Sequence, residues 1–220
     1  LFSEFTDEGT NDSKFSNLTS LEELNFDYQL IDTEEKRKEF IQIIKTKDFF
    51  SLDTETTDVD PINAELVGMS FSYTENQAFY VPVPSDKEEA LKIVNEFKEV
   101  LENEKTLKIG QNIKYDILAL SNYGVNVKGP MFDTMIAHYV LQPELRHNMD
   151  YLAEIYLHYQ TIHIEELIGS KGKNQGNMRD LSPEAVCNYA CEDADITLQL
   201  KEVLEKELKE NGAERLFYDI

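Results

Sequence analysis

The chain has 220 residues, 41% of them hydrophobic, which is enough for one sizeable soluble domain. No apolar run approaches the roughly 20 residues that a transmembrane helix needs, so we expect no membrane partner. The formal net charge of −22 is opposite in sign to that of a typical nucleic-acid-binding surface, but residues 105–179 hold eight Lys and Arg against seven Asp and Glu. Net charge therefore neither favours nor excludes an anionic partner.

Hydrophobic periodicity predicts an α/β fold behind a polar leader at residues 1–26, which we expect to be flexible. An edge strand is predicted at 27–31 and a helix at 34–45. Three strands follow, at 49–54, 65–73 and 78–84, and we expect them to form an antiparallel meander. A helix at 86–102 precedes a short strand at 106–110. The remainder is predicted as helices at 113–122, 132–141 and 148–159, with a long helix from Ser182 onward, giving a central mixed sheet flanked by helices.

The last helix begins with two strong signals, Ser182 as the capping residue and Pro183 at the first helical position. Cys187 and Cys191 lie four residues apart within it, a spacing that favours two buried thiols over a disulfide. The glycine-rich, basic segment 169–180 before it fits a plain surface loop and a contact to a nucleic-acid backbone equally well.

The stretch FFSLDTETTD, residues 49–58, runs from a buried strand directly into a group of acids. Because side chains alternate along a strand, Asp53 and Glu55 share one face and Thr54 takes the other. No Lys or Arg lies between positions 48 and 60 to neutralise them. Two adjacent carboxylates raise each other's pKa and are costly to bury, so the pair requires either a cation or water.

Two later segments carry further acids. In GQNIKYD, residues 110–116, Asn112 can cap a helix whose first turn holds Asp116, and taken alone this acid is best explained by the helix dipole. In the last helix, Tyr189 and Asp193 fall within the apolar stripe, whereas a solvated acidic face suits Glu192 and Asp195. A carboxylate on a buried stripe needs a partner.

These motifs resemble a family. DTET, then NxKYD, then YxxxD in this order resemble the DEDD exonucleases of the tyrosine subgroup, which have a ribonuclease H-like (DnaQ-like) fold. GQNIKYDILALSNYG, MFDTMIAHYVL, RHNMDYLAE, GKNQ and YACEDADITLQL are similar to the 3′–5′ proofreading domain of bacterial DNA polymerase I. The resemblance implies an exonuclease domain at 27–210. It also implies that residues 211–220 begin the connection to a polymerase domain that this chain does not include.

The resemblance also implies the site. Asp53, Glu55, Asp116 and Asp193 would hold two divalent metal ions, with Mg²⁺ expected and Mn²⁺ or Zn²⁺ as alternatives, and Tyr189 would orient the attacking water. Contacts to the nucleic acid are implied for a further set of residues: Thr54, Val59, Gln111, Asn112, Tyr115, Arg146 and Ile164. Asp133 matches a family acid outside the metal set and is better explained as a helix cap.

The implied function is hydrolysis of phosphodiester bonds at the 3′ end of single-stranded or mispaired DNA, which proofreads for a polymerase attached in cis, by a cytoplasmic monomer. Two alternatives stay open. One is a ribonuclease D-like enzyme that trims RNA, since that relative shares the carboxylates and the tyrosine. The other is a catalytically silent structural module, which the presence of all four carboxylates argues against.

Overall fold

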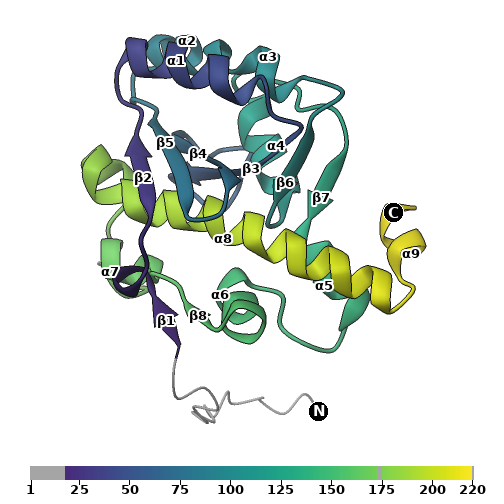
Figure 1. Ribbon diagram of the computed structural model, residues 1–220. Helices are drawn as coiled ribbons and strands as arrows, with labels where there is room; N and C mark the ends of the chain where they lie inside the picture. The colour runs from purple at the N-terminus through teal and green to yellow at the C-terminus, as the bar shows by residue number, and fades with distance from the viewer. Residues whose placement is uncertain (1–17, 173–174, 220) are drawn as a thin grey trace, which may run out of the picture.

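A mixed sheet forms the centre of the molecule in the computed structural model, which describes residues 18–172 and 175–219 (Figure 1). The order across this sheet is β2-β5-β4-β3-β6-β7. Its strands are β2 Asp27–Leu30, β3 Phe49–Thr56, β4 Leu66–Thr74, β5 Gln77–Pro82, β6 Leu107–Gly110 and β7 Met131–Asp133. The predicted meander is confirmed, because β3 pairs antiparallel with β4 and β4 antiparallel with β5, and β2 is an edge strand.

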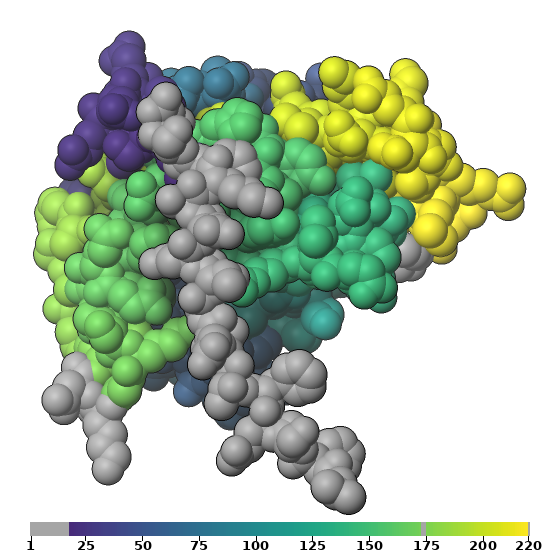
Figure 2. Space-filling model, turned by 90° about the horizontal axis from the view of Figure 1, so that it is seen from below, coloured from purple at the N-terminus to yellow at the C-terminus, as the bar shows by residue number. Residues whose placement is uncertain are grey.

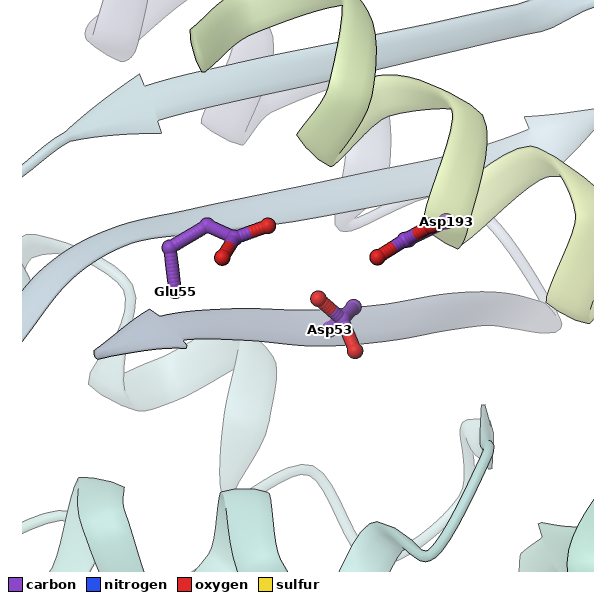
Figure 3. Close-up of side chains that lie close together, drawn as sticks. All are labelled: Asp53, Glu55 and Asp193. Atoms are coloured by element: carbon purple, nitrogen blue, oxygen red, sulfur yellow. The ribbon is translucent and has the colours of Figure 1, made fainter. Parts of the chain in front are cut away.

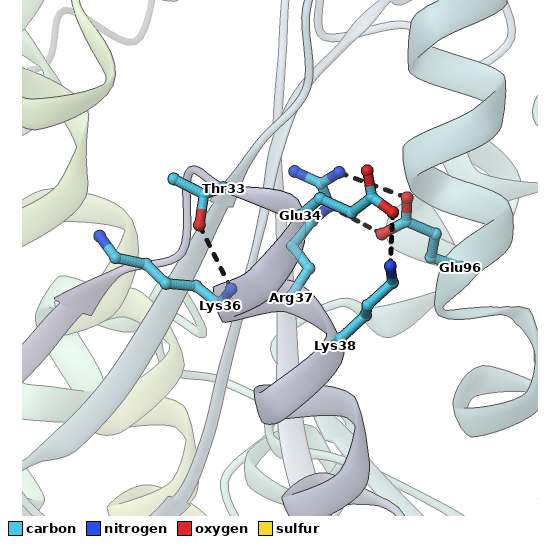
Figure 4. A network of polar contacts seen from close by, with 6 residues as sticks. All are labelled: Thr33, Glu34, Lys36, Arg37, Lys38 and Glu96. Carbon is cyan, nitrogen blue, oxygen red and sulfur yellow. Dashed lines mark hydrogen bonds and ion pairs between the residues drawn. The ribbon is translucent and has the colours of Figure 1, made fainter.

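One face of the sheet is covered by helices α1 Glu34–Ile44, α2 Lys87–Glu96, α3 Lys98–Leu101 and α4 Ile113–Ser121 (Figure 1). Phe50 and Leu52 of β3 point into this layer and are fully buried in its core. The predicted helix 86–102 is interrupted at Phe97, which is also fully buried there. Arg37 of α1 donates to Glu96 at 2.7 Å, so a largely buried ion pair joins α1 to α2 (Figure 4).

The opposite face of the sheet carries the long helix α8, Pro183–Glu210 (Figure 1). Its predicted start is confirmed: Ser182 accepts a hydrogen bond from the amide of Ala185, and Pro183 occupies the first turn. Cys187 and Cys191 are buried free thiols, as predicted. Mid-helix, the carbonyl of Ala194 accepts a 2.6 Å hydrogen bond from Ser51 of β3, which fixes the helix against the strand that precedes the acids.

A third layer packs on the far side of α8. It contains β1 Thr19–Ser20, β8 Tyr159–Gln160, α5 Thr134–Leu141, α6 Met149–Leu152 with the π turn Ala153–Leu157, α7 Ile164–Ile168 and α9 Glu214–Tyr218, with a 3₁₀ turn at Leu21–Glu23. A second 3₁₀ turn, Met178–Asp180, precedes α8 and contacts the sheet, where Arg179 donates to the carbonyls of Val83 and Leu66. Seen from this side, the green segments from α6 to α7 cover the middle of the molecule, and the yellow end of α8 emerges at one edge (Figure 2). Helix α8 is therefore enclosed on both sides.

Several predicted boundaries change in the structure. Residues 1–17 of the predicted leader lie outside the described residues, whereas Thr19 and Ser20 pair with β8, and Leu21 is buried against the third layer. The predicted helix 132–141 begins only at Thr134, because the residues before it form β7. Among the described residues, no helix is both long and apolar enough to span a bilayer.

Candidate active site

Three acids converge between strand β3 and helix α8 (Figure 3). One carboxylate oxygen from each of Asp53, Glu55 and Asp193 lies within 4.8 Å of the other two. Asp53 and Glu55 share a face of β3 as strand alternation predicts, and Asp193 comes from α8 opposite them. The pairing of β3 with β4 shifts by one residue immediately after Glu55, a β-bulge of the kind often found beside active sites.

No cationic side chain in the described part of the molecule neutralises the three acids. Among the described residues, no Lys or Arg forms an ion pair with any of them. Burial raises the pKa of Asp53 to about 6. The pKa values of Glu55 and Asp193 are raised well above the ordinary range, first by burial and then by the charge of neighbouring acids, Asp53 above all. The cluster is therefore unfavourable as an array of bare anions.

These residues fit a divalent cation. Oδ1 of Asp193 and Oε1 of Glu55 are buried and have no hydrogen-bond partner in the described part of the chain. Carboxylate oxygens are the ligands that Mg²⁺ and Mn²⁺ prefer, and a cation would both satisfy these atoms and neutralise the repulsion. The chemistry of the donors thus supports a divalent metal centre, without selecting one ion.

Asp116 approaches from the other side of the sheet. It lies in the first turn of α4, and its Oδ1 accepts a 2.6 Å hydrogen bond from the hydroxyl of Thr54. Its carboxylate does not belong to the 4.8 Å group, yet its pKa is raised by burial and then by the charge of Asp53. The structure therefore brings the fourth predicted acid next to the cluster but attaches it to the opposite face of β3.

Tyr189 lies one helical turn before Asp193 on α8, and its phenol lies close enough to that carboxylate for each group to affect the pKa of the other. Burial raises the pKa of the Tyr189 phenol far above its usual value, and the charges of Asp193, Glu55 and Asp53 add to this. The phenol is consequently protonated at neutral pH and available as a hydrogen-bond donor beside the acids.

The prediction that Glu192 and Asp195 lie on a solvated face is wrong, because both are buried. Glu192 accepts hydrogen bonds from the Tyr159 hydroxyl at 2.5 Å and the Ile162 amide at 2.6 Å. Asp195 accepts from the Tyr28 hydroxyl and from a backbone amide of the β4–β5 turn. The third layer therefore covers Glu192, whereas strand β2 and the β4–β5 turn cover Asp195. The sequence does contain a signal for a helix buried on all sides, because small or apolar residues occur all around it: Ala190, Cys191, Ala194 and Leu198.

The predicted nucleic-acid contacts fall into two groups. Val59 is 92% exposed, and Arg146 is exposed, so both are open to a ligand. Tyr115 is half-buried; its hydroxyl contacts the Asp58 carbonyl and the Thr56 hydroxyl, each at 2.5 Å, and thereby holds the loop that presents Val59.

The other residues predicted to contact nucleic acid make contacts within the protein. The Thr54 side chain is buried and turned toward Asp116. Gln111 donates to the carbonyl of His147 at 2.6 Å, so it anchors the segment that carries Arg146. Ile164 is half-buried at the start of α7 and packs against the same hydrophobic cluster as Tyr189.

The prediction that the Asn112 side chain caps helix α4 is wrong. Asn112 adopts a left-handed backbone conformation with φ of 60° and makes no capping hydrogen bond with its side chain. Asp133 caps the helix instead, accepting from the amides of Asn112 and Ile113. Asp133 also caps α5, as predicted, through the amide of Met135. One carboxylate thus fixes the starts of two helices, a link between distant segments that local sequence does not reveal.

The chain is similar in sequence to known proteins. A family model described as 3′–5′ exonuclease matches residues 28–209. DNA polymerase I of Borreliella burgdorferi is 33% identical over 98% of this chain, and that of Pseudomonas aeruginosa is 36% identical over 83%. The matched regions make up 24% and 21% of those two proteins, so the chain spans about a quarter or less of their length.

Solved structures show the same fold. Brucella melitensis NrnC bound to pGG superposes with a TM-score of 0.68 at 18% identity, covering 89% of this chain and 87% of that one. Escherichia coli RNase D, an exoribonuclease involved in structured RNA processing, gives 0.68 at 18% identity, covering 89% of this chain and 48% of that one. At this identity the likeness is one of fold, and it confirms the predicted ribonuclease H-like architecture. The family match over most of the chain, together with relatives more than 30% identical, shows that the chain belongs to the 3′–5′ exonuclease family found in DNA polymerase I.

Proposed function

We propose that this chain removes nucleotides one at a time from the 3′ end of single-stranded or mispaired DNA, using two divalent cations. The observation that carries the proposal is the group formed by Asp53, Glu55 and Asp193, in which two buried carboxylate oxygens have no partner within residues 18–172 and 175–219. Divalent cations bound there supply a water of lowered pKa and positive charge near the leaving 3′ oxygen. Hydrolysis joins the water oxygen to phosphorus and breaks the bond from phosphorus to O3′, which releases a nucleoside 5′-monophosphate.

The protein side chains divide this work. Asp53, Glu55 and Asp193 hold the cations from β3 and α8, and Asp116 contributes from α4, where Thr54 orients it. The Tyr189 hydroxyl, beside Asp193, donates a hydrogen bond that orients the attacking water. Because the phenol keeps its proton at neutral pH, it positions the water and does not act as the base.

The exposed residues near the site supply contacts to the strand. Val59, presented by the loop that Tyr115 holds, packs against the terminal base, and Arg146 pairs with a backbone phosphate. Only an unpaired strand can be splayed into such a site, so single-stranded ends are preferred. In a longer protein of this family the domain proofreads for a polymerase domain in cis, acting as a cytoplasmic monomer.

The test is cleavage of a 5′-labelled single-stranded DNA by the chain with Mg²⁺ or Mn²⁺. We expect a ladder that shortens from the 3′ end, disappears with a chelator, and forms more slowly on a blunt duplex. A matched RNA strand is the comparison for the ribonuclease D-like alternative, and faster cleavage of RNA would favour that function. If neither strand is cleaved with either ion, the domain is a silent module and the proposal is wrong.

A further inference from the structure

Three buried serines lie on the face of the sheet that supports helix α8: Ser51 on β3, with Ser70 and Ser72 on β4. Each is fully buried. Small side chains at these positions let the helix approach the sheet closely, which by itself would account for their size. Their hydroxyls, however, are not equivalent.

Two of the three hydroxyls are satisfied by backbone carbonyls. Ser51 donates to Ala194 of α8 at 2.6 Å, and Ser72 contacts the carbonyl of Gln77 at 2.7 Å. Ser70 Oγ is buried without any hydrogen-bond partner among the residues that the structure describes. A buried hydroxyl left unpaired costs about 1–3 kcal/mol, and an alanine would fill the same space without that cost. Close packing alone therefore does not explain Ser70.

The position of Ser70 points to the acids. Ser70 is the cross-strand partner of Asp53 in the antiparallel pairing of β3 with β4. Side chains of such partners project to the same face with their Cβ atoms about 4.5–5.5 Å apart. On its other side Ser70 is paired with Tyr80, whose hydroxyl is directed to the carbonyl of Val67 at 3.3 Å and is not available to it.

Three of the five unpartnered buried polar atoms in the described chain therefore belong to one place: Ser70 Oγ, Glu55 Oε1 and Asp193 Oδ1. One is a hydroxyl that can donate, and the other two are carboxylate oxygens that can only accept when ionised. Such a set is unsatisfied in the described residues while no cation is bound. It becomes satisfiable when the acids are ionised and held by a cation, because carboxylates that bind metals are themselves usually hydrogen-bonded.

We propose that Ser70 is a positioning residue for the metal centre, whose hydroxyl donates a hydrogen bond to the Asp53 carboxylate when a divalent cation occupies the site. The proposal rests on the proposed function for the presence of the cation. It assigns to Ser70 a role in cation affinity, which is separate from the packing role that Ser72 shares with it.

The experiment compares Ser70→Ala with Ser72→Ala in the whole chain, using Mn²⁺ as the probe. Mn²⁺ affinity is measured by calorimetric titration, and unfolding by denaturant is measured separately in chelator. We expect Ser70→Ala to weaken Mn²⁺ binding about tenfold, the lower end for removing a hydrogen-bond partner of a metal ligand, while metal-free stability stays the same or rises. Ser72→Ala should do the reverse, lowering metal-free stability and leaving Mn²⁺ affinity unchanged.

Ser70→Cys provides a second variant of similar size with a weaker donor, and it should give an intermediate affinity. If Ser70→Ala and Ser70→Cys both bind Mn²⁺ as tightly as the parent, Ser70 is a packing residue and the proposal is overturned. If the parent itself fails to bind Mn²⁺, the metal site of the proposed function is wrong, and the role of Ser70 is overturned with it. The two failures are distinguished by the parent titration alone.

Discussion

Thr54 Oγ1 donates a 2.6 Å hydrogen bond to Asp116 Oδ1. This bond links strand β3, which carries Asp53 and Glu55, to helix α4, which carries Asp116. Thr54 points to the face of β3 opposite to Asp53 and Glu55. The strand therefore carries two acids on one face and a hydrogen-bond donor to a further acid on the other. The hydroxyl favours the ionised form of Asp116, whose pKa burial otherwise raises.

Thr54→Val removes this hydroxyl at nearly constant volume. We expect the rate of single-strand cleavage to fall about tenfold, since outer partners of metal ligands typically contribute 10- to 100-fold. The matched control is Thr161→Val, because the Thr161 hydroxyl makes an equivalent 2.8 Å bond to Asp150 in the third layer. Both variants should lose stability in denaturant, but only Thr54→Val should lose rate, and equal rates for the two would show that the bond is purely structural.

Asp193→Asn and Asp195→Asn should change stability in opposite directions, although the two residues are neighbours on α8. Asp193 lies among other acids, and one of its oxygens has no partner among the described residues. Removing its charge should therefore stabilise the metal-free protein and lower the cleavage rate at least a hundredfold. Asp195 accepts hydrogen bonds from the Tyr28 hydroxyl and the backbone N–H of Asn76. In Asp195→Asn, the side-chain NH₂ group would face one of these donors and could not accept from it.

For Asp195→Asn we therefore expect about 1–3 kcal/mol of lost stability with cleavage retained in the folded fraction. Urea unfolding in chelator and single-turnover cleavage with Mn²⁺ measure the two effects. A destabilised Asp193→Asn protein would mean that Asp193 has a structural partner in solution, and near-normal cleavage by it would remove Asp193 from the metal ligands.

The strands and the long helix could be predicted because their signals are local. The apolar run from Phe49 to Leu52 indicates a strand that continues into the acids. Ser182 followed by Pro183 marks the start of a helix within two residues. Short elements gave no comparable signal. Strand β7 has three residues, and β1 joins β8 across about 140 residues of sequence with only two paired positions each.

The site was predictable where a side chain's role depends on its own element, as with Asp53 and Glu55 on one face of a strand. It was not predictable where the role depends on a neighbour. The burial of Glu192 follows from the third layer over α8, and the capping of α4 by Asp133 follows from the pairing of β6 with β7. The juxtaposition of Ser70 with Asp53 follows from the register of β3 with β4, which hydrophobic periodicity does not determine.

The metal-free protein should become more stable as the pH is lowered from about 7.5 toward 5.5. Burial raises the pKa of Asp53 from 3.8 to about 6 on folding, so across that interval the folded chain binds its proton more tightly than the unfolded chain does. Stability from this group is complete below the unfolded pKa and is lost as the pH rises through the folded pKa. Glu192, whose pKa burial raises to about 7, acts in the same direction.

Denaturant unfolding in chelator at several pH values measures this slope. Asp53→Asn should flatten it, and saturating Mn²⁺ should oppose it by stabilising the ionised acids at the higher pH. Lowering the pH also reduces the overall negative charge, which stabilises the folded chain independently of Asp53. The decisive quantity is therefore the difference in pH dependence of stability between the parent and Asp53→Asn. Parallel pH profiles for these two proteins would show that Asp53 has an ordinary pKa in the folded chain.

Tyr189→Phe separates the positioning of water from the binding of metal. The variant keeps the ring that packs beside α7 and removes only the hydroxyl next to Asp193. We expect turnover to fall by up to about a hundredfold, the low end for groups that position or transfer a proton, while Mn²⁺ and single-strand affinities stay nearly unchanged. Tyr159→Phe is the matched control, since it removes a buried hydroxyl that donates to Glu192 on the same helix, on the side that faces the third layer.

The measurement is single-turnover cleavage at saturating DNA and Mn²⁺, which isolates the chemical step from binding. Since burial raises the pKa of the Tyr189 phenol, the parent should show no loss of rate from phenol ionisation up to about pH 10, and the Phe variant should have a profile of the same shape at a lower level. A Phe variant within about twofold of the parent would make Tyr189 a packing residue, because orientation of the attacking water would then not depend on its hydroxyl.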